Sequence, residues 1–556
     1  MVDFSIIIGG KAGFGIDRAS VIIGRLFNQL GYRIYIYRDY PSLIRGGHTF
    51  SVIRVSSDRI AAHRSKIDFL LALNQDTLDL HRDKLKDGCF FLYDPELVKV
   101  PGQACGVGVA IGKILKEENA PEIMRNTCII GALCKAVGID AKTMEDVLRK
   151  EIPRELELNL KVASRGFGES RELTRVEPLV RERLPVVSGN EAIGLGLVKG
   201  GLNFYVAYPM TPSSPILHFL AEKATEFGIK VIHPESEIAV ILMALGFAYM
   251  GKKTAVGTSG GGFCLMTEGL SFAGMAELPV VIVMGQRPGP STGLPTYSSQ
   301  TELHFVLNAG QGEFPRFVAA PGDAEEAYYW SAAAMNIAWK YQIPSFILSD
   351  KNLAEGIFNF DINSVEPIKE ENPLLWDKTS PYKRYLNTES GVSPLAFPPE
   401  QGAPIKVNSY EHDESGITTE EPATAKTMTE KRLRKEKYLS GELEGYKTIN
   451  VYGNKDSSTA ILCWGSNKGV CVEAAKNTDL KVIQPVVLWP FPADRFRDEL
   501  KGVKTLISVE DNATGQLARL VKAFGFDVDE QILKYDGRPF SVDGLEEELK
   551  KWTRKT

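Results

Sequence analysis

Short apolar strands and helical segments alternate in the middle of the chain, and this alternation restricts the fold more than any other feature. Strands are expected at residues 202–209, 230–234, 253–258 and 279–287, each separated from the next by a helical segment. Strands joined by helices in this way run parallel, and helices cover both faces of their sheet. We therefore predict an α/β fold whose central domain, residues 186–385, is a doubly wound parallel sheet.

The first 185 residues form a separate α/β block. Residues 4–10 (FSIIIGG) have the composition of a buried strand, and a glycine-rich loop, a helical pattern at 17–31 and a second strand at 32–40 follow. This order predicts a βαβ unit. Further strands are expected at 69–74 and 89–94, and a helical region at 121–150.

The rest of the chain divides into a connector and a third domain. Residues 386–445 are rich in Pro, Glu, Lys and Thr and lose periodicity, which predicts an extended connector. Alternating apolar and helical segments resume at residues 446–556. We predict a third, C-terminal α/β domain there, so that the chain has three domains and one connector.

Composition excludes several classes of partner. The 65 basic and 70 acidic residues give a net charge of −5, which offers no basis for binding nucleic acid or an anionic membrane. The seven cysteines include no CxxC pair, so we expect no zinc or iron–sulfur site in this chain. The N-terminal segment lacks the basic region of a signal peptide, and the longest apolar run, residues 238–250, is too short to span a membrane. We predict a cytoplasmic protein.

The glycine-rich loop GGKAGFG partly matches a dinucleotide fingerprint. Its glycines are Gly9, Gly10, Gly13 and Gly15, but the third glycine of GxGxxG is missing. A tight turn is therefore favoured over NAD binding, and a different phosphate ligand stays open. Residues 45–48 (RGGH) stand before a strand and predict either a turn or a phosphate or partner contact.

Polar residues follow four of the central strands. They are residues 210–215 (MTPSSP), 235–237 (ESE), 259–262 (SGGG) and 286–289 (QRPG). Each group has an ordinary structural explanation as a helix cap, a favourable charge at a helix N-terminus, a turn or a solvated arginine. Because the carboxyl ends of parallel strands share one sheet edge, we expect the four groups to line a single crevice.

Long motifs in these segments resemble a known family. YPMTPSSP, HPESEIAV, TSGGGFCLMTEGLSFAGMAELPVVIV and GQRPGPSTGLPT occur in the order found in the α subunit of 2-oxoacid:ferredoxin oxidoreductases. GGKAGFGID and YPSLIRGGHTFSVIRVS resemble the γ subunit of these enzymes, here fused N-terminally. EHDESG and VEDNATGQL resemble later parts of the α subunit, and the whole is most similar to the 2-oxoglutarate type. The resemblance implies a transketolase-like C-terminal domain.

The resemblance implies thiamine diphosphate as cofactor, whose thiazolium is an electron sink for the carbanion that decarboxylation leaves. It implies that Glu237 hydrogen-bonds N1′ of the aminopyrimidine, with Glu235 as the alternative. It places the hydroxyl of Thr211 at the substrate, on a backbone restricted by neighbouring prolines. It assigns Arg287 to the substrate carboxylate, which a guanidinium can bind through two parallel hydrogen bonds.

The same resemblance implies which residues bind the cofactor. Besides Glu237, these are Tyr208, Pro209, Ser259, Gly260 and Gly261. No residue of this chain is expected to bind a metal, because the GDG motif for diphosphate and metal is missing. The resemblance places the diphosphate site, Mg²⁺ and the iron–sulfur cluster on a separate β subunit. It also implies coenzyme A as co-substrate, ferredoxin as electron acceptor, and a dimer of αβ heterodimers.

We therefore expect CoA-dependent oxidative decarboxylation of a 2-oxoacid, 2-oxoglutarate to succinyl-CoA, which can also run as carboxylation, and activity only together with the β subunit. Specificity for pyruvate or a branched-chain 2-oxoacid is an alternative. Two other classes stay open. One is a self-contained oxidoreductase that binds NAD or FAD through GGKAGFG. The other is a non-catalytic scaffold subunit.

Overall fold

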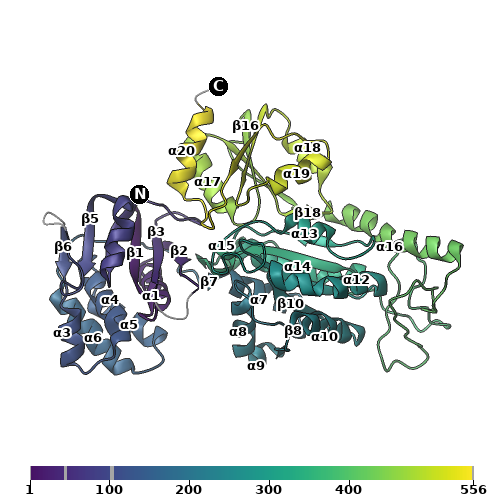
Figure 1. The fold of residues 1–556 in the computed structure, drawn as a ribbon, viewed down its shortest axis with the longest axis horizontal. Helices are drawn as coiled ribbons and strands as arrows, with labels where there is room; N and C mark the ends of the chain where they lie inside the picture. Colours follow the sequence, from purple (N-terminus) through teal and green to yellow (C-terminus); the bar gives the residue numbers. More distant parts are fainter. Residues whose placement is uncertain (1, 43–46, 101–104, 554–556) are drawn as a thin grey trace. The chain divides into compact units, whose positions relative to one another are not determined.

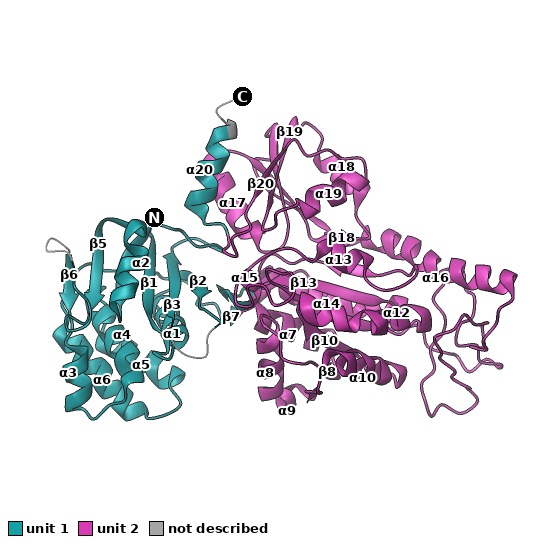
Figure 2. Ribbon diagram, viewed as in Figure 1, with its two compact units in different colours: residues 1–187, 355–361, 540–556 teal, residues 188–354, 362–539 magenta. Residues whose placement is uncertain are grey.

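The structure is a computed structural model that describes residues 2–42, 47–100 and 105–553. Its chain divides into two compact units (Figure 2). Unit 1 comprises residues 1–187, 355–361 and 540–556, and unit 2 comprises residues 188–354 and 362–539. The described strands form three sheets among helices, which confirms the α/β fold class. Residues 540–556, assigned to the C-terminal domain from the sequence, group with unit 1 in the structure.

Unit 1 contains a mixed sheet with the strand order β6-β5-β4-β1-β3-β2-β14-β7 (Figure 1). Strand β3 pairs antiparallel with both β1 and β2, so β1 and β2 run parallel to each other without being neighbours. The predicted βαβ unit is therefore present, but β3 is inserted between its two strands. The strands are β1 (Asp3–Lys11), β2 (Arg33–Asp39), β3 (His48–Ser56), β4 (Ile67–Ala72), β5 (Leu85–Tyr93), β6 (Cys105–Gly108), β7 (Val186–Ser188) and β14 (Ile357–Asn359).

The helices of unit 1 enclose one apolar core, in which Ile6, Ile8 and Phe27 are fully buried. The helical region expected at 121–150 consists of a short 3-10 turn and two helices, which separate at residues 137–140. The helices are α1 (Ile16–Gln29), α2 (Gln75–His81), α3 (Ile111–Glu117), α4 (Arg125–Ala136), α5 (Ala141–Glu151), α6 (Leu156–Glu169) and α20 (Val542–Thr553), with 3-10 turns η1 (Arg82–Lys84) and η2 (Glu122–Met124).

The glycine-rich loop of unit 1 is a tight turn between β1 and α1. Gly13 and Gly15 have φ angles of 97° and 68°, which L-residues with a Cβ rarely adopt. A Cβ on Gly15 would lie 2.4 Å from Asn126 Nδ2, which donates a hydrogen bond to the Gly15 carbonyl (3.2 Å). Backbone geometry and this close approach account for both glycines without a dinucleotide. Of the RGGH segment, Arg45 and Gly46 lie outside the described residues.

Unit 2 contains the predicted doubly wound sheet, with the strand order β18-β12-β13-β11-β10-β8-β9. Every pairing is parallel except that of β12 with β18. The strands are β8 (Phe204–Val206), β9 (Lys230–Ile232), β10 (Thr254–Thr258), β11 (Val280–Gln286), β12 (Phe317–Ala319), β13 (Pro344–Asp350) and β18 (Val487–Trp489).

Helices cover both faces of this sheet (Figure 1). Along β11, Val280, Ile282 and Met284 join one apolar cluster with α10 and α12, whereas Val281 and Val283 are buried on the other face. The helices of this part are α7 (Gly189–Lys199), α8 (Ser214–Glu222), α9 (Ala224–Phe227), α10 (Glu237–Tyr249), α11 (Gly260–Phe263), α12 (Thr267–Ala276), α13 (Leu303–Asn308), α14 (Ala324–Tyr341) and α15 (Lys351–Glu355), with 3-10 turns η3 (Cys264–Met266) and η4 (Ile362–Ser364).

The C-terminal part of unit 2 forms a five-stranded sheet with the order β15-β17-β16-β19-β20. The apolar run at residues 480–488 (LKVIQPVVL) is divided into β17 and β18, and β18 joins the neighbouring seven-stranded sheet. The elements are β15 (Ile449–Gly453), β16 (Thr459–Cys463), α17 (Asn467–Thr478), β17 (Lys481–Pro485), α18 (Ala493–Glu499), β19 (Thr505–Glu510), α19 (Gln516–Ala523) and β20 (Glu530–Leu533).

The predicted extended connector contains one long helix, α16 (Pro422–Leu443). The buried face of this helix includes Lys431 and Lys435 between apolar residues, so its sequence lacks a continuous apolar stripe. Lys431 and Lys435 pair with Glu277, and Lys431 Nζ lies 2.8 Å from Glu277 Oε1. Burial alone would raise the pKa of Glu277, but the two lysines hold it well below its usual range. The connector is thus attached to the central domain by buried charges.

Candidate active site

The four polar segments predicted to line one crevice do lie at one sheet edge. They follow β8, β9, β10 and β11, which are parallel neighbours in the order β11-β10-β8-β9. In chain order, β9 is placed on one side of β8, and the next strand, β10, is placed on the opposite side of β8. The direction in which strands are added therefore reverses at β8. Ligands of doubly wound sheets bind at such a reversal, beyond the carboxyl ends of the strands. The crevice is therefore expected between the ends of β8 and β10.

The proline-rich turn after β8 is held by hydrogen bonds to three consecutive carbonyls. Ser213 Oγ donates to the Met210 carbonyl, Arg287 Nη1 to the Thr211 carbonyl, and Asn190 Nδ2 to the Pro212 carbonyl, each at 2.9 Å. Thr211 itself is half-buried. Two of the three predicted catalytic residues, Thr211 and Arg287, are thus in direct contact.

Glu237, the third predicted catalytic residue, is the first residue of α10. Ser236 caps the helix by accepting a hydrogen bond from the Ala239 amide (3.5 Å), and a carboxylate in this first turn suits the helix dipole. The side chain is only 5% exposed, yet Oε1 has no hydrogen-bond partner among the described residues. The alternative residue, Glu235, is exposed to solvent.

The glycine segment after β10 forms the short helix α11. Its N-cap residue, Ser259, is fully buried, but the hydroxyl makes no capping bond and has no partner among the described residues. A Cβ on Gly262 would lie 2.6 Å from Glu237 Oε1, so the missing side chain lets the turn contact that carboxyl group. Glu237 and the glycine turn are therefore brought together.

The remaining predicted residues lie at the outer part of the site. Tyr208 and Pro209 are exposed, and the Tyr208 ring meets His233 edge-on at 5.8 Å between centroids. Gly261 is exposed and Gly260 is half-buried. These positions are the exposed part, or rim, of the candidate site, whereas Glu237 and Ser259 are buried.

The sequence interpretation missed one acidic residue, Glu302, at the N-terminus of α13. A Cβ on Gly260 would lie 2.8 Å from its Oε1, and its buried Oε2 has no partner among the described residues. Burial raises the pKa of Glu302 to about 7, although the Thr301 hydroxyl and the Arg287 charge both lower it. An acid directly before an apolar helical run usually indicates only a cap, so nothing in the sequence pointed to its contact with the glycine turn.

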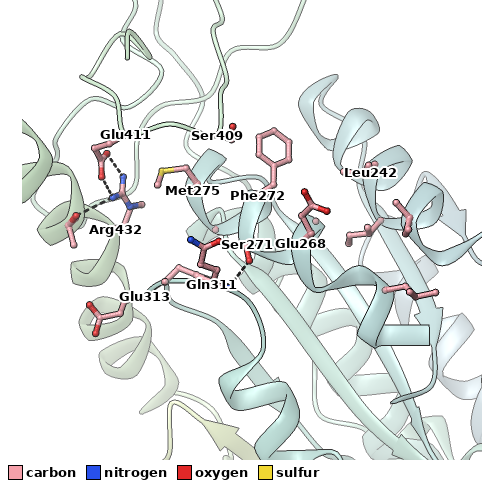
Figure 3. A pocket seen from close by; sticks show the side chains of 18 residues that line it. Leu242, Glu268, Ser271, Phe272, Met275, Gln311, Glu313, Ser409, Glu411 and Arg432 are labelled. Carbon is pink, nitrogen blue, oxygen red and sulfur yellow. Dashed lines mark hydrogen bonds and ion pairs between the residues drawn. The ribbon is translucent and has the colours of Figure 1, made fainter. Parts of the chain in front are cut away.

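A separate cavity of about 720 Å³ lies against α10 and α12 (Figure 3). Leu242, Phe272 and Met275 contribute apolar walls, and the Glu411–Arg432 ion pair closes one side. Its eighteen lining residues include none of the predicted site residues. Acidic side chains, such as Glu268, make this cavity unsuited to an anionic substrate. The strand ends, and not this cavity, are therefore the candidate active site.

The donor set at the strand ends fits an aminopyrimidine. A buried carboxyl oxygen of Glu237 and the buried hydroxyl of Ser259 have no partner among the described residues, although buried polar atoms are normally hydrogen-bonded. Both could pair with the polar edge of a flat heteroaromatic ring that approaches the glycine turn. The half-buried guanidinium of Arg287 adds a binding group for an anion.

Comparison with known families gives the class of the chain. Residues 196–431 match the family described as "Pyruvate flavodoxin/ferredoxin oxidoreductase, thiamine diP-bdg". Residues 5–169 match "Pyruvate ferredoxin/flavodoxin oxidoreductase". The doubly wound fold and the match of residues 196–431 thus define a chain with a thiamine-diphosphate-binding domain. No described helix is long and apolar enough to cross a membrane.

Whole-chain relatives narrow the class further. The 2-oxoacid:ferredoxin oxidoreductase subunit alpha of Saccharolobus solfataricus is 32% identical, over 98% of this chain and 96% of the relative. The chain belongs to the 2-oxoacid:ferredoxin oxidoreductases as an α subunit, and an α subunit implies partner subunits in a heteromeric enzyme.

Two further relatives bear on the substrate. The 2-oxoglutarate synthase subunit KorA of Methanocaldococcus jannaschii is 29% identical over 58% of this chain and 88% of that protein. The 2-oxoglutarate:ferredoxin oxidoreductase of Magnetococcus marinus, solved with 2-oxoglutarate, coenzyme A and succinyl-CoA bound, is 29% identical, covers 100% of both chains and has a TM-score of 0.90.

Proposed function

We propose that the complete enzyme oxidises 2-oxoglutarate to succinyl-CoA and CO2. In this reaction a C–C bond to the carboxylate breaks, a thioester bond to coenzyme A forms, and the electron pair passes to ferredoxin. The observation that carries this substrate assignment is the full-length similarity to the Magnetococcus marinus enzyme, whose structure holds these ligands. In the reverse direction the same chemistry is a carboxylation.

Within this reaction the chain's own residues bind, orient and exchange protons. Thiamine diphosphate, when bound, supplies the electron sink for decarboxylation. Glu237 Oε1 is free to share a proton with N1′ of the aminopyrimidine, and Ser259 and the glycine turn form the wall that the ring would approach. Arg287 would bind the substrate carboxylate, and the fixed turn after β8 would present the Thr211 hydroxyl to it. Tyr208, Pro209, Gly260 and Gly261 would contact the cofactor from the rim.

The partner subunit would complete the site. We assign to a β subunit the diphosphate and Mg²⁺ site and the iron–sulfur cluster, since this chain contains neither a GDG motif nor a CxxC pair. A dimer of αβ heterodimers is the proposed assembly, in the cytoplasm, with ferredoxin as acceptor. The four-part division of the chain, with domains at 1–185, 186–385 and 446–556 and a connector at 386–445, stays a prediction.

The first experiment compares the isolated chain with the complete heteromer. We expect no viologen reduction by the isolated chain with any 2-oxoacid and CoA, and turnover by the heteromer with kcat/KM highest for 2-oxoglutarate. Pyruvate and a branched-chain 2-oxoacid serve as the competing substrates. Turnover by the isolated chain would contradict the divided site, and flavin absorbance in the pure chain would support an FAD-dependent oxidoreductase instead.

Replacing Arg287 with alanine in the heteromer is expected to raise KM for the 2-oxoacid about 10- to 100-fold, because a hydrogen-bonded charge pair is worth about 1.5–3 kcal/mol. The variant also loses the bond to the Thr211 carbonyl. Steady-state kinetics measure KM, and titration calorimetry checks that thiamine diphosphate binds with unchanged affinity. An unchanged KM would show that the carboxylate binds elsewhere.

A further inference from the structure

Glu302 is a buried acid next to the proposed substrate arginine. Glu302 is only 8% exposed, and its Oε2 atom has no hydrogen-bond partner among the described residues. Its amide donates to Gln286 Oε1 (3.1 Å), which fixes the start of α13 against the end of β11. A buried acid with an unpaired oxygen is costly unless a ligand, a proton or a charge compensates for it.

The glycine turn, residues 259–262 at the start of α11, separates Glu302 from Glu237. The missing Cβ of Gly260 faces Glu302, and that of Gly262 faces Glu237. Positions two residues apart on a helical turn point to nearly opposite sides, so one carboxyl group lies on each side of α11. Glu302 is therefore held apart from the carboxyl group proposed to meet the cofactor, on the side of Arg287.

Thr301 lies between the Glu302 carboxyl group and the backbone of Arg287. The Thr301 hydroxyl lies 2.9 Å from Glu302 Oε1 and 3.5 Å from the Arg287 carbonyl. Burial lowers the pKa of Arg287, which the Glu302 charge partly opposes, and the Arg287 charge in turn opposes the rise that burial causes in the pKa of Glu302. The guanidinium thus has two possible anionic partners, the Glu302 carboxylate and a bound substrate.

We propose that Glu302 is a positioning residue that sets how much of the Arg287 charge is available to the substrate carboxylate. When Glu302 is protonated, the guanidinium attracts the 2-oxoacid with its full charge. When Glu302 is ionised, it competes with the substrate for that charge. The inference rests on the proposed function of Arg287.

Other titratable groups around Glu302 do not compete for this role. Arg287 acts on it from the loop after β11, and Glu237 lies beyond the glycine turn on α10. His304 follows on α13, with Nε2 3.0 Å from the Gln516 carbonyl of α19, and burial lowers the pKa of this histidine. With a pKa of about 7, Glu302 changes charge near neutral pH.

The sign of the pH effect follows from this pKa. Glu302 is neutral below about pH 7 and ionised above it, so substrate affinity is expected to fall as pH rises through 7. Because this coupling acts in both directions, a bound substrate carboxylate favours the protonated form of Glu302. Substrate binding is therefore expected to take up a proton. If bound substrate raises the pKa of Glu302 by about one unit, KM is expected to rise about 10-fold as the pH increases from below to above the pKa values of Glu302.

The test uses the complete heteromer and two readouts. KM for 2-oxoglutarate is measured from about pH 6 to pH 8, and proton uptake on binding glutarate, an unreactive dicarboxylate, is measured by calorimetry in buffers of different ionisation enthalpy. We expect the Glu302→Gln variant to show a flat KM and no proton uptake, and Glu302→Asp to restore both. Glu313→Gln, at an exposed glutamate outside the site, should behave as the parent.

Proton uptake by Glu302→Gln equal to that of the parent, or a parallel pH profile of KM, would overturn the role of Glu302. A heteromer that turns over no 2-oxoacid would instead overturn the proposed function, and the glutarate measurement would still report on Glu302. A Glu302→Gln variant whose KM no longer depends on pH, but which binds the cofactor with unchanged affinity, distinguishes the proposed effect from a folding defect.

Discussion

Replacing Glu237 with glutamine is expected to lower kcat of the complete enzyme about 100- to 10,000-fold, the scale of a positioned acid–base group. Glutamine has nearly the same shape but cannot hold or release the proton that the unpartnered Oε1 is placed to share. The measurement is the initial rate of viologen reduction at saturating 2-oxoacid and CoA. The lower limit corresponds to about 2.7 kcal/mol of lost transition-state stabilisation.

Glu235→Gln is the matched control, because Glu235 lies two residues earlier and is exposed. It removes the same charge near the same helix N-terminus, so a general electrostatic effect on α10 would appear in both variants. We expect the control to stay within about twofold of the parent. Comparable losses in the two variants would indicate such a general electrostatic effect, and a fully active Glu237→Gln would show that another group handles the proton.

The position of the crevice could be predicted from the sequence because it depends on chain order alone. Alternating strands and helices require parallel strands, and parallel strands bring their carboxyl ends to one edge. Thr211, Glu237, Ser259 and Arg287 each follow a different strand, so their shared edge follows from the pattern. The sequence could not show which of these residues are buried with unpaired atoms, since that depends on packing from elements distant in the chain.

Three features depended on tertiary contacts and escaped prediction. Helix α16 buries Lys431 and Lys435 against Glu277, a pattern that looks like a solvated segment when only periodicity is considered. Strand β18 leaves the sheet of its neighbour β17 to pair with β12, which no local signal indicates. Glu302 looks like an ordinary cap, and its contact with Gly260 spans more than forty positions in the chain.

Gly262→Ala tests whether the glycine turn places Glu237, and we expect it to lower kcat about 100-fold. The new Cβ would lie 2.3 Å from Thr258 Oγ1 and 2.6 Å from Glu237 Oε1, closer than real Cβ atoms come to any atom. Thr258 ends a buried strand and has little room to move, so Glu237 is expected to shift. A displacement of about 1 Å in a catalytic group costs about 100-fold in rate.

Overpacking a buried site also costs about 1–3 kcal/mol of unfolding free energy, which is comparable to the expected loss of transition-state stabilisation, so the unfolding free energy is measured separately. Gly441→Ala on the exposed side of α16 is the control, because a Cβ there meets nothing within 4 Å, and it should leave kcat unchanged. The double variant Gly262→Ala, Glu237→Gln separates two explanations. If the methyl group acts by displacing Glu237, the double variant should be no slower than Glu237→Gln alone, because residues that act as a unit are not additive. Multiplied losses would instead mean that the methyl group blocks the approach of the cofactor itself, independently of the carboxyl group.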